Sequence, residues 1–475
     1  MPKEYRFLVD GNWYQSPEKL VIKNPYNDEP VGVIHRAQEN DVNKAIESAH
    51  NAFQKMKHLS SHERAQILHN IVNGLKKLTD DIIETMVKDS GKPIKFAEGE
   101  FHRALNTFTL SAEESTRITG ELLPLDVTNI SKNRIGIIKR FPLGVIVGIT
   151  PFNFPLNLVA HKVGPCIASG NTMILRPSSQ TPITALKLGE ICMEAGLSPG
   201  ALNVIPCSTT LVEKLLTDDR VKKVSFTGSA EIGWSIKEKA HKKKVTLELG
   251  GNAAVIVDKD ADIEFAARRI AIGSFAYAGQ VCIAVQRIYV HKSIYEHFYK
   301  AFEKVVKNEI VTGDPMKEET VVGPIIEDSA ADRIMEWVQE AKQNGAKALI
   351  DGKRNGRMIE PIVLTDVSPS MKVSCKEIFG PVVTIESYEH FSDAIARVNN
   401  SVYGLQCGVF TKNLDYVLKA FNEIEVGGVI INDYPTFRVD NMPYGGVKES
   451  GFGREGVRYA IEEMTELKLL VLNFH

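Results

Sequence analysis

The first half of the chain shows two regular spacings of apolar residues. Apolar positions recur every three or four residues over 41–86 and 98–119, with charged residues between them, which predicts amphipathic helices. The alternating stretch 134–140 and the continuous apolar run 144–149 predict strands instead. The second of these strands runs into a proline-rich turn, 150–155.

Three more strand–turn–helix units follow that turn. Their strands and helices are 171–177 with 183–195, 202–206 with 211–216, and 223–229 with 231–240. Strands that alternate with amphipathic helices predict a parallel α/β sheet, in which ligands bind at the carboxyl ends of the strands. The turns at those ends are 150–153, 176–179 and 227–229, so this part of the chain is predicted to bind a nucleotide.

A second α/β series is predicted to form a separate sheet. Its strands are 245–251, 254–257, 287–290, 382–386 and 428–432. The tail, 463–473, alternates like a strand but has no neighbouring segment with which to form a hairpin. An unpaired strand of this kind favours pairing with another subunit.

Composition narrows the class of protein. The chain has 475 residues, 43% hydrophobic and 24% charged, with 57 Lys and Arg against 59 Asp and Glu. These values indicate a globular protein of two or three domains, and they argue against a disordered chain, a fibre or a nucleic-acid partner. We find no signal-peptide pattern and no stretch of about 20 apolar residues, so we expect a cytoplasmic location and no membrane partner. The six cysteines form no CxxC pair, so neither disulfides nor a metal site is expected.

Three residues at turns of this α/β pattern suit acyl chemistry. Cys282 lies among small residues at the predicted start of a helix or turn, where backbone N–H groups stabilise a thiolate and later an oxyanion. Glu248 ends an apolar strand, where burial would raise its pKa toward that of a general base. Asn153 lies in a rigid turn that would aim its amide at an oxyanion. Singly, Cys282 is equally compatible with a buried structural thiol and Glu248 with a helix cap or ion-pair partner, while an Asn in the position of Asn153 is more often a turn residue.

The sequence resembles the aldehyde dehydrogenase superfamily over nearly its whole length. Seven motifs occur in the expected order, at 150–155, 176–182, 226–229, 247–251, 279–282, 377–381 and 443–448. The resemblance implies an α/β fold with a Rossmann-like coenzyme domain, a catalytic domain and a β-arm for oligomerisation. The implied boundaries are 1–118 with 141–246 for coenzyme, 247–432 for catalysis, 119–140 with 455–475 for the arm, and 433–454 for a loop beside substrate and coenzyme.

The resemblance also implies a mechanism. Cys282 would attack the aldehyde carbon to give a thiohemiacetal, whose oxyanion is held by the Asn153 side chain and the Cys282 backbone N–H. Hydride would then pass to the nicotinamide, and Glu248 would activate water to hydrolyse the remaining thioester to an acid. Relatives that transfer the acyl group to coenzyme A lack a Glu at the Glu248 position, so its presence favours hydrolysis.

The coenzyme is expected to be NAD or NADP. The residues that the resemblance assigns to it are Ile149, Thr150, Pro151, Phe152, Arg176, Ser178, Ser179, Phe226, Gly228, Ser229, Leu249, Gly250, Glu377 and Phe379. Within this set, Glu377 would bind the nicotinamide ribose, Phe379 would pack beside it, and Ser229 would meet the pyrophosphate. Many NAD-selective members have a Glu where this chain has Ser179, and Arg176 replaces a common Lys, so a 2′-phosphate is allowed.

The substrate is expected to be a short hydroxylated or anionic aldehyde, oxidised to its carboxylic acid. Segments 435–446 and 458–466 are similar to the branch of lactaldehyde, sulfolactaldehyde and non-phosphorylating glyceraldehyde-3-phosphate dehydrogenases. Arg103 and Arg438 are candidates to grip the anionic group, although each is also compatible with a structural ion pair. Val281 stands where the glyceraldehyde-3-phosphate branch typically has an Arg.

Several alternatives stay open from the sequence. The substrate alternatives are glyceraldehyde 3-phosphate and succinate semialdehyde. Two hypotheses from other functional classes are a Cys-dependent esterase and a non-enzymatic binding protein. By resemblance, the expected partner besides the aldehyde is a second copy of the chain, in a homodimer or homotetramer.

Overall fold

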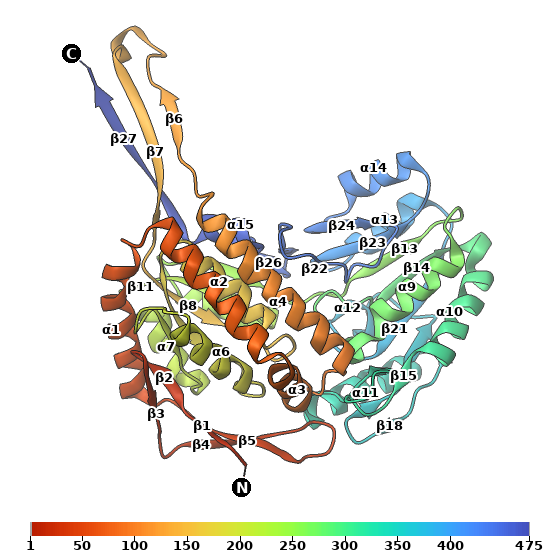
Figure 1. Cartoon of the computed structure of the whole chain (residues 1–475). Helices are drawn as coiled ribbons and strands as arrows, with labels where there is room; N and C mark the ends of the chain where they lie inside the picture. The colour runs from red at the N-terminus through yellow and green to blue at the C-terminus, as the bar shows by residue number, and fades with distance from the viewer. Residues whose placement is uncertain (1, 475) are drawn as a thin grey trace.

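Two α/β units and a three-stranded arm make up the fold (Figure 1). The computed structural model describes residues 2–474. In Figure 1 the first unit lies on the left, the second on the right, and the arm projects away from both. Each unit contains its own apolar core.

The first unit contains an eight-stranded sheet with the order β26-β12-β11-β8-β9-β10-β2-β3. Its strands are β2 (Phe7–Val9), β3 (Asn12–Tyr14), β8 (Val145–Ile149), β9 (Thr172–Arg176), β10 (Leu202–Val204), β11 (Val221–Thr227), β12 (Lys244–Glu248) and β26 (Gly451–Phe452). The five strands from β12 to β10 run parallel. From β8 the chain first adds strands on one side and then returns to add β11 and β12 on the other. Such a reversal opens a ligand crevice at the carboxyl ends of β8 and β11.

Nine helices belong to this unit. They are α1 (Glu39–Met56), α2 (Ser61–Lys77), α3 (Thr79–Ser90), α4 (Ile94–Ser115), α5 (Asn157–Ala168), α6 (Ile183–Glu194), α7 (Thr209–Thr217), α8 (Ala230–Lys239) and α15 (Val457–Glu463). The helical pattern predicted over 41–86 is thus divided among three helices. One division falls at Ser60, whose hydroxyl caps α2 while Glu63 reaches back to the Ser60 N–H, so the local hydrogen bonds favour a new helix start.

The second unit contains a seven-stranded sheet with the order β17-β20-β21-β14-β13-β23-β24. Its strands are β13 (Ala254–Val257), β14 (Arg287–His291), β17 (Lys347–Ile350), β20 (Ile362–Thr365), β21 (Val382–Tyr388), β23 (Gln406–Phe410) and β24 (Gly428–Ile431). All neighbours are parallel except β17 with β20. The helices are α9 (Ile263–Phe275), α10 (Tyr295–Glu309), α11 (Asp328–Gln343), α12 (Lys372–Cys375), α13 (Phe391–Asn399) and α14 (Leu414–Glu423).

The prediction that the second sheet begins at 245–251 is wrong. The strand in that segment, β12, pairs with β11 over five residues and with β26 on its other side, so it is part of the first sheet. The second sheet begins with β13. The apolar pattern of β12 fits any buried strand, and only its long-range pairing decides which sheet it joins.

The tail has a strand partner within its own chain. β27 (Thr465–Asn473) pairs antiparallel with β7 (Arg134–Pro142) over nine residues, and β6 (Glu121–Pro124) lies on the other side of β7. The local pattern left the tail unpaired because its partner lies far away in the sequence, whereas the pairing agrees with the arm of 119–140 and 455–475 that the resemblance implied. β27 is still an edge strand of this sheet.

The remaining elements are short. They are β1 (Glu4–Tyr5), β4 (Lys19–Lys23), β5 (Pro30–His35), β15 (Val311–Thr312), β16 (Thr320–Val322), β18 (Arg354–Asn355), β19 (Met358–Ile359), β22 (Tyr403–Gly404), β25 (Val447–Lys448), η1 (Asn129–Ser131), η2 (Ala276–Gly279) and η3 (Lys292–Ile294). Within residues 2–474, no helix combines the length and apolar character needed to span a bilayer.

Candidate active site

The structure brings the three predicted chemical residues to one place between the units. Asn153 follows β8, Glu248 ends β12, and Cys282 follows η2. The Asn153 amide donates to the backbone carbonyl of Gln280 at 2.9 Å. A Cβ atom at Gly251 would lie 2.9 Å from the carbonyl oxygen of Cys282, so the turn after Glu248 also meets the Cys282 loop.

The loop that presents Cys282 has an unusual backbone. Tyr277, Ala278 and Gly279 have φ angles of 53°, 55° and 68°, and left-handed conformations cost about 1–3 kcal/mol for each non-glycine residue. Local contacts hold the loop in place: the Tyr277 hydroxyl donates to the Ser90 carbonyl at 3.1 Å, and the Gln280 side chain accepts from Ile326 N–H at 3.0 Å. Cys282 therefore lies in a fixed turn, which is one of the two predicted settings.

The Cys282 thiol is partly buried and has a partner that the sequence reasoning missed. Its Sγ lies 3.0 Å from the Tyr444 hydroxyl oxygen. Burial raises the pKa of the thiol to about 11, while Tyr444 and the positive charge of Arg438 act to lower it. The thiol is consequently protonated at neutral pH in this arrangement. Tyr444 belongs to the motif at 443–448, but no pattern in the sequence pairs it with Cys282.

Glu248 is a buried carboxylate without a hydrogen-bond partner. Its residue is 3% exposed, and neither carboxylate oxygen has a partner among residues 2–474. Burial raises its pKa well above the usual range, and the negative charge of Glu455 adds to this shift. A buried acid with a raised pKa close to a thiol fits a general base. Gly445 leaves room for it, because a Cβ there would lie 2.9 Å from Glu248 Oε1.

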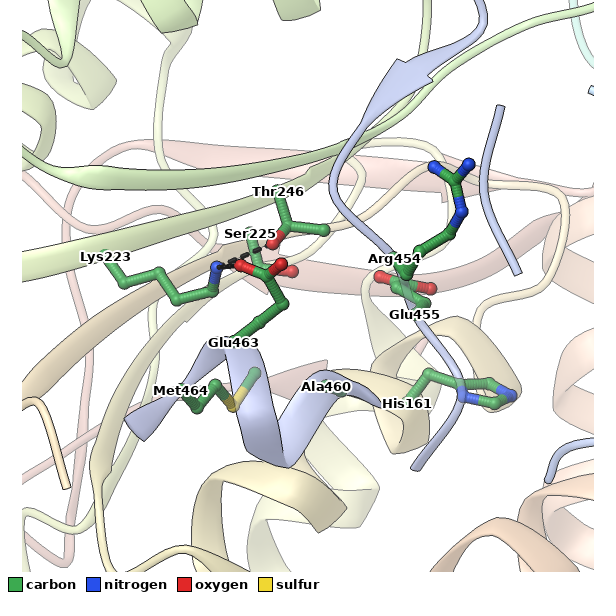
Figure 2. A pocket seen from close by; sticks show the side chains of 9 residues that line it. All are labelled: His161, Lys223, Ser225, Thr246, Arg454, Glu455, Ala460, Glu463 and Met464. Carbon is green, nitrogen blue, oxygen red and sulfur yellow. Dashed lines mark hydrogen bonds and ion pairs between the residues drawn. The ribbon is translucent and has the colours of Figure 1, made fainter. Parts of the chain in front are cut away.

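A polar layer that sequence reasoning also missed lies behind Glu248. Lys162 Nζ lies 2.7 Å from Glu455 Oε1 and 2.8 Å from the hydroxyl of Thr227. Burial alone would raise the pKa of Glu455, but Lys162, His161 and Arg438 lower it overall. Figure 2 shows Glu455 and His161 at one side of a small cavity in this layer. The sequence feature that could have revealed this layer is Lys162 in the largely apolar helix α5, because buried lysines are rare unless they are paired.

The turn that carries Asn153 leads into α5, and a carboxylate on α4 fixes the start of that helix. Glu100 on α4 accepts the N–H groups of Leu156 and Asn157, at 2.8 and 3.0 Å, at the start of α5. Glu100 is itself paired with the buried Lys92. The Asn153 amide uses one N–H on Gln280, and its Oδ1 is buried without a partner within the described chain. The amide carries a second N–H that can serve an oxyanion.

The predicted coenzyme residues of the first unit border the crevice. Ile149 ends β8, and Phe226 lies in β11. Ser229 is the N-cap of α8, with an exposed side chain whose hydroxyl does not cap its own helix, and a helix N-terminus favours phosphate. Arg176 donates to Ser179 Oγ at 3.2 Å, while its Nε is buried without a partner among residues 2–474. These features fit a dinucleotide.

Glu377 and Phe379 approach the crevice from the second unit. Glu377 Oε1 accepts from the Gly251 N–H at 3.0 Å, and burial raises the pKa of this carboxyl to about 7. A Cβ at Gly250 would lie 2.1 Å from Glu377 Oε2, so glycine is required for this approach. The Phe379 ring packs edge-on against Phe152, with ring centres 5.9 Å apart.

The two arginines proposed for substrate have different surroundings. The Arg438 guanidinium lies over the Tyr444 ring at 3.6 Å, and its side chain is 7% exposed. Its Nε and one Nη are buried without hydrogen-bond partners in the described part of the chain. Arg103 instead donates to Asp440 at 2.7 Å, and its side chain is 29% exposed. Both arginines thus form ion pairs, Arg438 Nη with Glu455 Oε2 at 3.8 Å and Arg103 with Asp440, but only Arg438 lies over the ring whose hydroxyl contacts the thiol.

Comparisons with known proteins agree with this geometry. A model of the aldehyde dehydrogenase family matches residues 13–470. A 3-sulfolactaldehyde dehydrogenase from Priestia megaterium is 46% identical, over 99% of this chain and 98% of that protein. The crystal structure of aldehyde dehydrogenase 21 from Physcomitrella patens, in complex with the reaction product succinate, has a TM-score of 0.97 and 43% identity, covering 100% of this chain and 99% of that one.

A glyceraldehyde-3-phosphate dehydrogenase from Methanocaldococcus jannaschii, complexed with NADP, is also similar. Its TM-score is 0.92 and its identity 36%, covering 97% of this chain and 100% of that one. The family model and these relatives extend over nearly the whole sequence and include the segments that carry Asn153, Glu248 and Cys282. The chain therefore belongs to the aldehyde dehydrogenase family.

Proposed function

We propose that this enzyme oxidises a short, anionic, hydroxylated aldehyde of the sulfolactaldehyde type to its carboxylic acid, with NAD or NADP. The observation that carries the substrate class is Arg438. Its buried guanidinium lies 3.8 Å from Glu455 Oε2, yet two of its nitrogen atoms have no hydrogen-bond partner among residues 2–474, and it lies one aromatic ring away from the Cys282 thiol. Such donors favour an anionic ligand, because buried N–H groups without partners are costly. The 46% identical sulfolactaldehyde dehydrogenase supports this choice.

The arrangement of side chains supports a thioester mechanism. Once the Cys282 thiol has lost its proton, its thiolate forms a bond to the aldehyde carbon and the carbonyl electron pair moves onto oxygen, where the second N–H of Asn153 and the Cys282 backbone N–H stabilise the resulting oxyanion. NAD or NADP, which the crevice residues such as Ser229 and Glu377 would hold, would supply the acceptor for the hydride of this carbon. Glu248, whose raised pKa makes it a competent base, takes a proton from the water that attacks the thioester. The acid then leaves and Cys282 is free again.

The coenzyme residues support acceptance of NADP as well as NAD. The Arg176–Ser179 contact at 3.2 Å places a guanidinium at the end of β9 without a carboxylate at position 179. A guanidinium attracts a 2′-phosphate, and the missing carboxylate removes the usual repulsion. The NADP complex of the Methanocaldococcus jannaschii relative agrees with this assignment.

Succinate semialdehyde is a second candidate substrate. It is also short and anionic, and the structurally similar aldehyde dehydrogenase 21 was crystallised with succinate as its product. Glyceraldehyde 3-phosphate is less favoured, because the residue before Cys282 is the buried, apolar Val281. A hydroxyl group on the carbon next to the aldehyde separates sulfolactaldehyde from succinate semialdehyde, and kinetics would distinguish the two.

The test is a set of initial rates of NADH and NADPH formation over six aldehydes. The panel is sulfolactaldehyde, lactaldehyde, succinate semialdehyde, glyceraldehyde 3-phosphate, glycolaldehyde and propanal. We expect the highest kcat/KM for sulfolactaldehyde. A preference for propanal over every anionic aldehyde would contradict the substrate class. Ester hydrolysis with no reduced coenzyme from any aldehyde would favour the esterase reading, and failure to bind either dinucleotide would favour a non-enzymatic role.

We further propose that the first α/β unit binds the coenzyme and the second supplies the nucleophile. In this division Glu248 belongs to the coenzyme unit, because β12 is a strand of the first sheet. We also propose a cytoplasmic homodimer or homotetramer assembled through the arm. The free edge of β27 exposes Leu467, Leu469 and Val471, which favours a protein partner. Sedimentation equilibrium of the intact chain, and of a chain lacking 465–475, would test the assembly.

A further inference from the structure

We propose that the Tyr444 hydroxyl is the hydrogen-bond donor that holds the Cys282 thiolate, and that Arg438 supports it by placing a positive charge over the same ring. This inference rests on the proposed function only in taking Cys282 as the nucleophile. It assigns no bond-making step to Tyr444, whose phenol keeps its proton throughout. The contacts that carry it are the 3.0 Å distance from Tyr444 Oη to Cys282 Sγ and the 3.6 Å distance from Arg438 Cζ to the ring centre.

The position of the Tyr444 hydroxyl is well determined by the fold. Tyr444 is 3% exposed. Its backbone N–H donates to the Glu455 carbonyl at 3.0 Å, and its backbone carbonyl accepts from the Glu455 N–H at 2.7 Å. The ring belongs to a small apolar cluster with Tyr277, Val281 and Leu405, which includes the residue immediately before Cys282. The phenol is thus fixed against the same loop that presents the thiol.

The direction of the hydrogen bond follows from the chemistry of the two groups. Burial raises the pKa of Tyr444 well above its usual range, and the neighbouring Cys282 adds to the shift, so the phenol stays protonated. A thiolate has no proton to donate, so once Cys282 ionises only the phenol can be the donor. Cys282 Sγ has no other hydrogen-bond partner among residues 2–474.

The charges around the thiol explain why such a donor is needed. Burial disfavours the thiolate, and the carboxyl groups of Glu377 and Glu248 disfavour it further. Tyr444 and Arg438 are the two groups that act in the opposite direction. A thiolate at Cys282 is therefore disfavoured by two nearby carboxyl groups, and Tyr444, from the 443–448 motif, offsets this with its hydrogen bond.

The experiment measures the thiol without any aldehyde. The rate of iodoacetamide alkylation is followed against pH for the full chain and for Tyr444→Phe, with Cys282→Ser as the blank because Cys375 is also only partly buried. The control is Tyr388→Phe, which removes a buried hydroxyl that contacts Asp258 at 3.0 Å. Tyr388 lies at the end of β21, whereas Cys282 precedes the start of the neighbouring strand β14.

We expect Tyr444→Phe to move the midpoint of alkylation upward by about one pH unit or more, with alkylation at neutral pH about tenfold slower, as for loss of a hydrogen bond to a charged group. Tyr388→Phe should leave the midpoint in place. An unchanged midpoint in Tyr444→Phe, or an equal shift in both variants, would overturn the inference. A shift specific to Tyr444→Phe would support it even if no aldehyde in the panel were oxidised, so its outcome is separate from that of the proposed function.

Discussion

Replacing Arg438 with methionine keeps the apolar stem of the side chain but removes the guanidinium, with its charge and its N–H donors. In the structure this change removes the 3.8 Å ion pair with Glu455 and a positive charge near Glu248, and it has two further effects. It removes the unpartnered Nε and Nη donors that we assign to the anionic group of the substrate. It also removes the positive charge over Tyr444 that lowers the pKa of the Cys282 thiol.

The two effects differ in their dependence on the substrate. The loss of thiolate stabilisation slows every aldehyde, charged or neutral, by the same factor. The loss of the donors affects only substrates with an anionic group. A hydrogen bond between a charged donor and a charged acceptor contributes about 1.5–3 kcal/mol, and each 1.4 kcal/mol is about tenfold. The expected loss in kcat/KM for an anionic aldehyde, relative to propanal, is therefore about 10- to 100-fold.

The assay compares kcat/KM for sulfolactaldehyde or succinate semialdehyde with kcat/KM for propanal, in wild type and in Arg438→Met. The ratio of these values cancels the effect on the thiol that all substrates share. Arg103→Met is the matched control, because Arg103 is paired with Asp440 and more exposed. We expect Arg103→Met to change the ratio less than Arg438→Met. Equal losses for anionic and neutral aldehydes in Arg438→Met would refute an anion-binding role.

Four further predictions concern the chemistry and the coenzyme. Cys282→Ala should abolish oxidation while leaving dinucleotide binding, measured by calorimetry, largely intact; turnover near that of the wild type would refute the nucleophile assignment. Glu248→Gln should give a burst of reduced coenzyme followed by little turnover in stopped-flow traces, whereas a steady rate without a burst would indicate another base. Because the pKa of Glu248 is raised and the base must be ionised, thioester hydrolysis should accelerate as pH rises through that pKa. A flat pH profile for this step would contradict the assignment. Ser179→Glu should lower kcat/KM for NADP at least tenfold relative to NAD; an unchanged ratio would place the 2′-phosphate elsewhere.

Local patterns predicted most of the elements around the site. The apolar run at 144–149 became β8, and the proline-rich turn after it holds Asn153. The unit at 223–229 became β11, with Ser229 as the N-cap of α8. These predictions succeeded because the period of apolar residues and the turn chemistry are local properties. The family, which the ordered motifs had suggested, is confirmed by the family model.

Local sequence patterns could not predict which strands pair when the partners lie far apart in the chain. β12 was assigned to the wrong sheet, and β27 was left without its partner β7. In both cases the strand itself was recognised, but its neighbour is chosen by the packing of distant segments. The stack of Arg438 on Tyr444 and the capping of α5 by Glu100 arise in the same way.

The sequence by itself determined the family, supplied the candidates for nucleophile, base and oxyanion donor, and predicted most strands and helices around the site, because these depend on residue type and local spacing. Only the tertiary structure decided which charges surround Cys282, that Glu248 has no hydrogen-bond partner among residues 2–474, and that Arg438 rather than Arg103 lies beside the thiol. The physical reason is that pKa values and ion pairs depend on distances and burial among residues far apart in the chain.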